Sequence, residues 1–175
     1  MKICRLLVLL FTVTFSATIS AQVTFTEGFE SLAYPPAGWS IYVPVPLGNY
    51  WIRQTSPTTN PAIAAHGGIA VSRFRSRNAA AGTKQYLVTR AIDLSYRGGL
   101  PARLEFWMYR DSLLPGNADS ITVWVGRADT LNTNSVRLGA IARNRRLPVP
   151  DTQAVNAWYR FSYSIPDTFN GTETR

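Results

Sequence analysis

Short segments in which apolar and polar residues alternate follow one another through most of the chain. The clearest of these segments are Ala102–Arg110, Ser120–Gly126 and Trp158–Ile165. In the first, Leu104, Phe106 and Met108 occupy every second position, with charged and aromatic residues between them. Because successive side chains of a strand point to opposite faces of its sheet, this alternation predicts strands with one face on a core.

Weaker segments of the same kind are also predicted to be strands: Val23–Phe29, Tyr50–Gln54, Gly68–Phe74, Gln85–Thr89 and Val136–Ala142. Connecting segments with turn-forming Pro, Gly and Asn separate the strands, over residues 31–48, 55–67, 76–83, 111–118 and 143–155. No helical periodicity is sustained after the N-terminal segment. About eight short strands at this spacing predict an all-β fold, an antiparallel β-sandwich of jelly-roll type.

The N-terminal segment has the pattern of a secretory signal peptide. Lys2 and Arg5 accompany the apolar run Leu6–Phe15, and small residues follow that run up to Ala21. A positively charged start, a short apolar region and small residues before the cleavage point are typical of export signals. We therefore expect a signal peptide over residues 1–21, a single domain over residues 22–175, and no membrane span after cleavage.

Charge and cysteine content narrow the choice of chemistry and partner. The formal net charge of +8 becomes +6 without Lys2 and Arg5. Lys84 is the only lysine after the predicted signal peptide, so the positive charge is nearly all arginine, which suits carboxylates, anionic sugars and aromatic faces. Cys4 is the only cysteine, which excludes disulfides and a cysteine nucleophile from the predicted mature part. No nucleic-acid-binding motif accompanies the charge, so we expect no nucleic acid partner.

Several motifs occur in an order that resembles a known group of domains. They are "FTEGFES", "PPAGW", "GIAVSRF", "KQYLVTRAIDLS", "LEFWMYRD" and "DSITVWVG". This set resembles the cleaved-adhesin and choice-of-anchor J domains, which are relatives of the MAM domain. Such domains occur in secreted and surface proteins of Gram-negative bacteria, including the haemagglutinin regions attached to gingipain proteases. The resemblance covers residues 24 to about 165.

The resemblance implies a jelly-roll β-sandwich similar to galactose-binding-like domains, often with a calcium ion. It implies binding or adhesion, and a location outside the cell or on the outer-membrane surface of a Gram-negative bacterium. Domains of this group normally close with strands that carry an acidic pair of the form "iDDv", whereas this sequence ends in "NGTETR". We therefore expect the closing strand to be missing.

Three acidic residues are the predicted calcium ligands. Glu30 matches the glutamate that lies near the calcium site in the group. Asp111 and Asp119 flank a loop between two strongly predicted strands. Calcium binds several hard oxygen ligands, drawn from carboxylates and loop carbonyls. The alternative is that Glu30 caps a turn and that both aspartates face solvent at strand ends.

Aromatic and arginine side chains are the predicted ligand-binding groups. Trp107 and Trp124 lie opposite the aliphatic rows of their strands, and exposed aromatic side chains stack on sugar rings or dock protein partners. Arg73, Arg75 and Arg77 alternate with other residues, which along a strand would place three guanidinium groups on one face. The alternatives are packing under loops for the tryptophans and a solvated strand end for the arginines.

No convincing catalytic set is recognisable in the sequence. His66 is the only histidine, and we interpret it as an ordinary loop residue because no nucleophile motif accompanies it. Nothing in the sequence sets a separation between Glu27, Glu30 and Glu105, so glycoside hydrolysis has little support. The sequence therefore predicts a secreted or surface-exposed, non-catalytic module that binds a host protein or glycan. The alternative is an accessory domain of a secreted peptidase or other hydrolase whose catalytic part is absent.

Overall fold

The computed structural model describes residues 24–44, 48, 50–55, 61–95, 100–113, 119–147, 153–169, 171 and 173–174. The predicted signal peptide lies outside the described residues. The strands of the described part are β1 (Ser40–Tyr42), β2 (Trp51–Thr55), β3 (Ala70–Phe74), β4 (Tyr86–Val88), β5 (Ile92–Asp93), β6 (Arg103–Arg110), β7 (Ser120–Val125), β8 (Val136–Ala142), β9 (Ala157–Ser164) and β10 (Glu173–Thr174). Single turns of 3₁₀ helix lie at Ser76–Asn78 and Asp167–Phe169.

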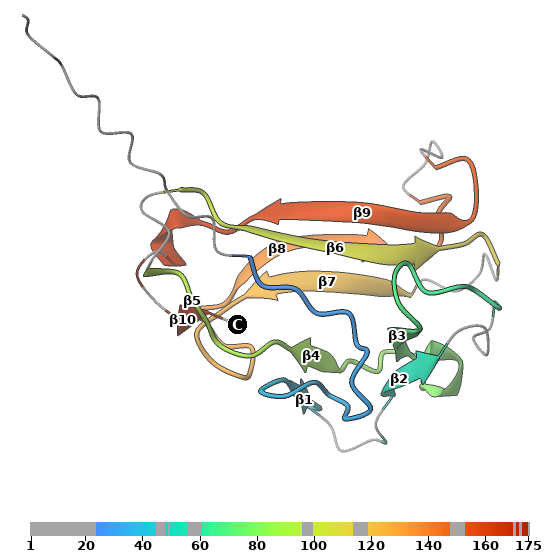
Figure 1. The fold of residues 1–175 in the computed structure, drawn as a ribbon, viewed down its shortest axis with the longest axis horizontal. Helices are drawn as coiled ribbons and strands as arrows, with labels where there is room; N and C mark the ends of the chain where they lie inside the picture. Colours follow the sequence, from blue (N-terminus) through green and yellow to red (C-terminus); the bar gives the residue numbers. More distant parts are fainter. Residues whose placement is uncertain are drawn as a thin grey trace, which may run out of the picture.

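The strands form antiparallel pairs, and four of these pairs are nested in the sequence. β2 pairs with β3 between the paired strands β1 and β4, and β7 pairs with β8 between the paired strands β6 and β9. β5 pairs with β10. Figure 1 shows β6 and β9 running together along one side of the molecule, with the short strands β1 to β4 on the opposite side. The predicted all-β, antiparallel architecture is confirmed.

The strongly alternating segments all form strands at the predicted places, as β6, β7 and β9. Two of the other predictions are wrong. The described residues of Val23–Phe29 form no strand, and β1 lies inside a segment predicted to be a connection. Phe29 has a positive φ of 60°, and the Glu27 carboxylate accepts a hydrogen bond from its backbone amide. This local side-chain bond favours a turn over an extended strand.

Aliphatic and aromatic side chains form the core. The buried apolar residues among those described include Ala70, Val71, Val123, Val125, Ile141 and Phe169. On the inner face of the β6–β9 pair, the Phe106 ring stacks near the rings of Phe161 and Tyr163, with centroid distances of 5.9 and 6.3 Å. A Cβ atom at Gly139 of β8 would collide with the Tyr163 ring. This glycine therefore lets β8 lie close against the aromatic inner face of β9.

Candidate functional site

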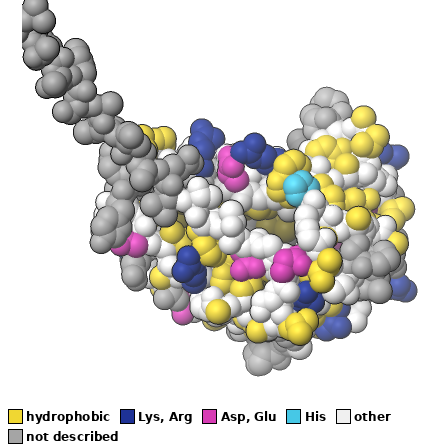
Figure 2. Space-filling model, in the orientation of Figure 1, with side chains coloured by type: hydrophobic (Ala, Val, Ile, Leu, Met, Phe, Trp, Pro, Cys, Tyr) yellow, Lys and Arg dark blue, Asp and Glu magenta, His cyan; other side chains and the backbone are white. Residues whose placement is uncertain are grey.

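The sheet face opposite this core carries charged and aromatic side chains that are exposed to solvent. The residues of this face alternate along β6 and β9 with the residues that point to the core. We call it the outer face and define it by Arg103, Glu105, Trp107, Arg160, Ser162 and Ser164, which are all exposed. Figure 2 shows basic, acidic, hydrophobic and histidine side chains next to one another along the side of the molecule where β6 and β9 run.

Trp107 is held in place by a loop that reaches it from far away in the sequence. The side chain is 45% exposed, and the His66 ring stacks on it with centroids 3.9 Å apart and planes 20° apart. The Trp158 ring lies edge-on to His66 at 6.0 Å, and its Nε1 donates a hydrogen bond to the Ala64 carbonyl at 3.0 Å. These contacts hold the loop on the sheet and restrict the orientation of the Trp107 ring.

A hollow of about 420 Å³ lies where this loop meets β6 and β9. Residues 62–66, Tyr109 and residues 156–158 line it. The Tyr109 ring packs edge-on against Trp158 at 5.8 Å. Burial raises the pKa of the Tyr109 hydroxyl, and the negative charge of Asp111 raises it further. The hydroxyl, which is protonated at neutral pH as in an ordinary tyrosine, is able to donate a hydrogen bond.

An ion pair crosses the outer face beside Trp107. Arg160 Nη2 lies 2.5 Å from Glu105 Oε2. The hydrogen bond from Arg160 is the main cause that lowers the pKa of the Glu105 carboxyl, and the charge of Arg103 adds to it. Arg103 itself donates to Ser162 Oγ at 3.1 Å. The face thus presents two guanidinium groups and one carboxylate next to an exposed indole.

Trp124, the second predicted ligand-binding tryptophan, lies on a different strand pair. It is half-buried on β7, opposite Arg137 of β8, and a β-bulge shifts the register between Val123 and Trp124. Val123 on the other side of the strand is buried. Trp124 therefore does not belong to the outer face of β6 and β9, and ligand binding by it stays a prediction.

The three predicted arginines do not share one strand. Arg73 lies in β3 and donates to Gln54 Oε1 at 2.6 Å. The strand ends before Arg75, and Arg77 lies in the 3₁₀ turn Ser76–Asn78. The expectation of three guanidinium groups along one strand face is wrong because this turn interrupts the extended backbone. Ligand binding by these arginines stays a prediction.

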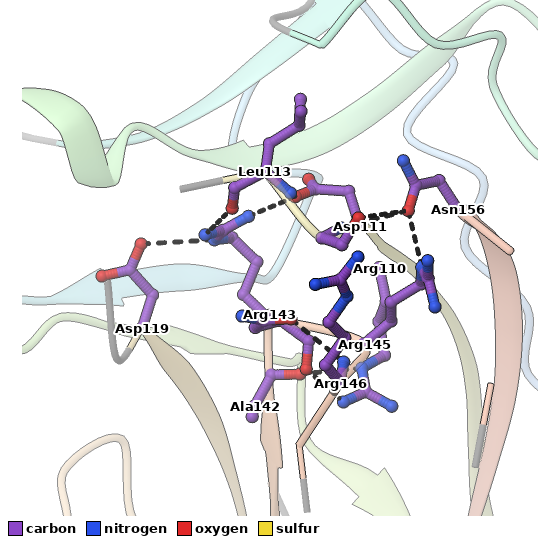
Figure 3. Close-up of polar contacts among 11 residues, drawn as sticks. Arg110, Asp111, Leu113, Asp119, Ala142, Arg143, Arg145, Arg146 and Asn156 are labelled. Carbon is purple, nitrogen blue, oxygen red and sulfur yellow. Dashed lines mark hydrogen bonds and ion pairs between the residues drawn. The ribbon is translucent and has the colours of Figure 1, made fainter. Parts of the chain in front are cut away.

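Asp111, one of the predicted calcium ligands, is paired with an arginine at the end of β6 (Figure 3). Its carboxylate lies 2.5 Å from Arg143 Nη1 and accepts a hydrogen bond from the Leu113 amide at 2.8 Å. Arg143 Nε also lies 3.5 Å from the Asp119 carboxylate. One guanidinium group therefore bridges the two aspartates that flank the loop.

Arg110, the last residue of β6, ties the neighbouring loops to the strand. Its buried guanidinium donates to the carbonyl oxygens of Ala142, Asn144 and Leu147 at 2.8, 2.7 and 2.6 Å. It also donates to Gln153 Oε1. Because buried carbonyl groups need donors, this arrangement stabilises the loop ends. We call Arg110, Asp111 and Arg143 the arginine anchor.

Glu30 fastens the opening segment to the start of β3. Both of its carboxylate oxygens accept the Ile69 amide hydrogen at 3.1 Å, and Oε1 also accepts that of Ala70 at 3.3 Å. A Cβ atom at Gly68 would clash with this carboxylate, and Gly68 has a positive φ of 70°. Glycine is therefore required there by both the turn and the close approach of Glu30.

The described residues do not bring the three predicted calcium ligands together. Within the ranges that the structure covers, no three His, Cys, Asp or Glu side chains form a group that could hold a metal ion. Arg143 already supplies a positive charge to Asp111 and Asp119, so these two carboxylates do not fit a calcium site as arranged. Calcium binding at Glu30 stays a prediction.

The fold is similar to that of a solved adhesin domain. No family model and no curated protein sequence matches the chain. None of the helical segments that the structure describes has the length and apolar character needed to cross a membrane. The crystal structure of the K2 cleaved adhesin domain of Lys-gingipain matches with a TM-score of 0.62 and 20% sequence identity, over 86% of this chain and 84% of that chain. The chain thus has the antiparallel β-sandwich fold of an adhesin domain.

Proposed function

We propose that the chain is a non-catalytic adhesion module, secreted or displayed at the surface of a Gram-negative bacterium, which binds a host protein or glycan. The outer face of β6 and β9 is its binding surface. The proposal rests mainly on Trp107. This large aromatic residue is 45% exposed, and its ring is nevertheless held in place by the stacked ring of His66. An indole fixed in this way contributes contact area without the entropic cost of ordering it on binding.

Two further observations support the proposal. The outer face combines the indole with charged and hydroxyl side chains on adjacent strands, and binding sites commonly join an apolar anchor to a few placed polar groups. The fold is similar to that of a cleaved adhesin domain.

A binding array tests this proposal. We expect the protein to retain a ligand from an array of glycans and extracellular host proteins, and Trp107→Ala to weaken that binding by about tenfold or more, because a central aromatic anchor dominates such contacts. Leu100→Ala is the matched control, since Leu100 is exposed to a similar extent, 43%, and lies outside the outer face. Equal loss in both variants, or full binding by a folded Trp107→Ala protein, would contradict the assignment.

A second candidate is an accessory domain of a secreted hydrolase. The observation that favours it is that the similar solved structure is one domain of Lys-gingipain. Sequencing the same reading frame on both sides of this chain distinguishes the two candidates. A peptidase domain in the frame supports the accessory role, whereas adhesin or sorting modules alone support the first candidate.

A further inference from the structure

The register of β6 and β9 places an arginine directly across from the exposed tryptophan. Trp107 pairs with Arg160 in the antiparallel ladder, and both side chains belong to the outer face. Side chains directly opposite each other on one face of such a pair are immediate neighbours. A ligand that rests on the indole therefore has a guanidinium group within reach.

The guanidinium of Arg160 is occupied by an exposed carboxylate of the same chain. Glu105 Oε2 lies 2.5 Å from Arg160 Nη2, and the two side chains are 41% and 57% exposed. Exposed ion pairs of this kind contribute little to stability, because water screens them and both side chains lose mobility. A ligand carboxylate can replace Glu105 at little cost to the fold.

The surroundings favour a negative charge at this point. Arg103 lies on the same face, with Glu105 between it and Trp107 along β6, and its guanidinium donates to Ser162 Oγ. Arg103 and Arg160 both lower the pKa of the Glu105 carboxyl, so the local field stabilises a carboxylate. The chain as a whole is basic, with a formal net charge of +8, which attracts anionic partners at long range.

We propose that the outer face binds a saccharide that carries a carboxylate group, with a sugar ring stacked on Trp107 and the carboxylate paired with Arg160. Glu105 occupies the place of the ligand carboxylate in the free protein. The inference rests on the proposed function and narrows it to acidic glycans. Aromatic side chains offer their faces to sugar rings, and arginine offers a planar fork that matches a carboxylate.

Sialyllactose and lactose are the probes that test this inference, because they differ by one carboxylated sugar. We expect the wild-type protein to bind sialyllactose at least about tenfold more tightly than lactose, since charge-assisted pairing with arginine adds to the stacking. Arg160→Gln should remove this preference, and Trp107→Ala should weaken binding of both sugars. Arg137→Gln, which removes an exposed arginine of β8, is the control and should retain wild-type affinity.

Glu105→Gln gives the sharpest result, because it is expected to gain binding. Without its internal carboxylate partner, Arg160 should bind sialyllactose about two- to fivefold more tightly, the range that corresponds to one exposed ion pair. Equal binding of the two sugars that still depends on Trp107 would overturn this inference and leave the proposed function intact. Binding of an acidic peptide or a host protein, with no sialyllactose binding, would also overturn it. If the protein binds nothing on the array of glycans and host proteins, both this inference and the proposed function are contradicted.

Discussion

Two carboxylate–guanidinium pairs involve residues of β6 or its immediate C-terminal end, one within the strand and one at the residue that follows it. Glu105 and Arg160 meet on the outer face with side chains 41% and 57% exposed. Asp111 and Arg143 meet beside the loops, with the Asp111 side chain only 5% exposed. The same kind of pair therefore occurs in two very different environments only six residues apart, at Glu105 and Asp111.

The difference lies in what else holds each pair. Asp111 also accepts a backbone amide hydrogen, and Arg143 also donates to the Leu113 carbonyl, so this largely buried pair, with side chains 5% and 20% exposed, is part of a wider hydrogen-bonded network. Glu105 and Arg160 are exposed, and water is able to solvate either one alone. The buried pair is suited to holding loops, and the exposed pair is suited to exchange with a ligand.

The largest expected effect is at the arginine anchor. Arg110→Met should lower the free energy of unfolding by about 3 kcal/mol, because several carbonyl acceptors lose their buried donor. Urea denaturation measures this. Arg103→Met on the exposed part of the same strand is the control and should change the unfolding free energy by less than about 0.5 kcal/mol. Similar values for the two variants would contradict the contrast between the ends of β6.

A smaller effect is expected at the buried carboxylate. Asp111→Asn keeps the shape of the side chain but removes the charge facing Arg143, so we expect a loss of about 2 kcal/mol in unfolding free energy. Asp119→Asn is the matched control, because its side chain is 37% exposed and lies farther from Arg143, at 3.5 Å. It should cost less than about 1 kcal/mol. Equal shifts of the denaturant midpoint in Asp111→Asn and Asp119→Asn would contradict the larger contribution of the buried carboxylate.

The third prediction concerns calcium. Since Arg143 already neutralises Asp111 and Asp119, we expect any calcium-dependent stability to require Glu30. Calcium at about tenfold above its dissociation constant should stabilise the wild-type protein by about 1.4 kcal/mol relative to chelator. Glu30→Gln should abolish this difference and Asp111→Asn should retain it, as measured by thermal melting. A wild-type midpoint that is the same in calcium and in chelator would rule out the calcium site.

The smallest effect is expected at the exposed pair. The hydrogen bond from Arg160 lowers the folded-state pKa of Glu105. The pair therefore stabilises the fold above the ordinary pKa of a glutamate, and this contribution is lost as the pH falls through the lowered value. Arg160→Gln should raise the pKa of Glu105 towards its ordinary value, as followed by NMR titration, and should remove the small stabilisation that this exposed pair contributes at neutral pH. An unchanged Glu105 titration in that variant would show that the pair does not form in solution.

The sequence predicts the long, regularly alternating strands well and the short strands poorly. The strands β6, β7 and β9 show the clearest alternation, and period-two patterning over six to eight residues is a strong local signal. The short strands β1, β5 and β10 have only two or three residues each. Such strands exist because their partners pair with them, and their own residues carry little pattern.

In the candidate site, too, local pattern predicts some features, and contacts between distant segments decide the others. Trp107 was predicted to lie on the face opposite the aliphatic row of its strand, and its exposure agrees with that position. The contribution of His66 was missed, because a loop contact between distant segments leaves no local pattern. The pairing of Glu105 with Arg160 also depends on the register of β6 with β9, which alternation within one strand does not specify.

Local patterning by itself determined the all-β class, the places of the long strands and the side of β6 on which the indole lies, because these follow from the period of a single strand. The tertiary structure alone decided which charges meet. It placed Arg143 between Asp111 and Asp119, where calcium had been expected, and it placed Arg160 opposite Trp107. The physical reason is that ion pairs and ring contacts join residues far apart in the chain, and only the strand register and the loop conformations bring them together.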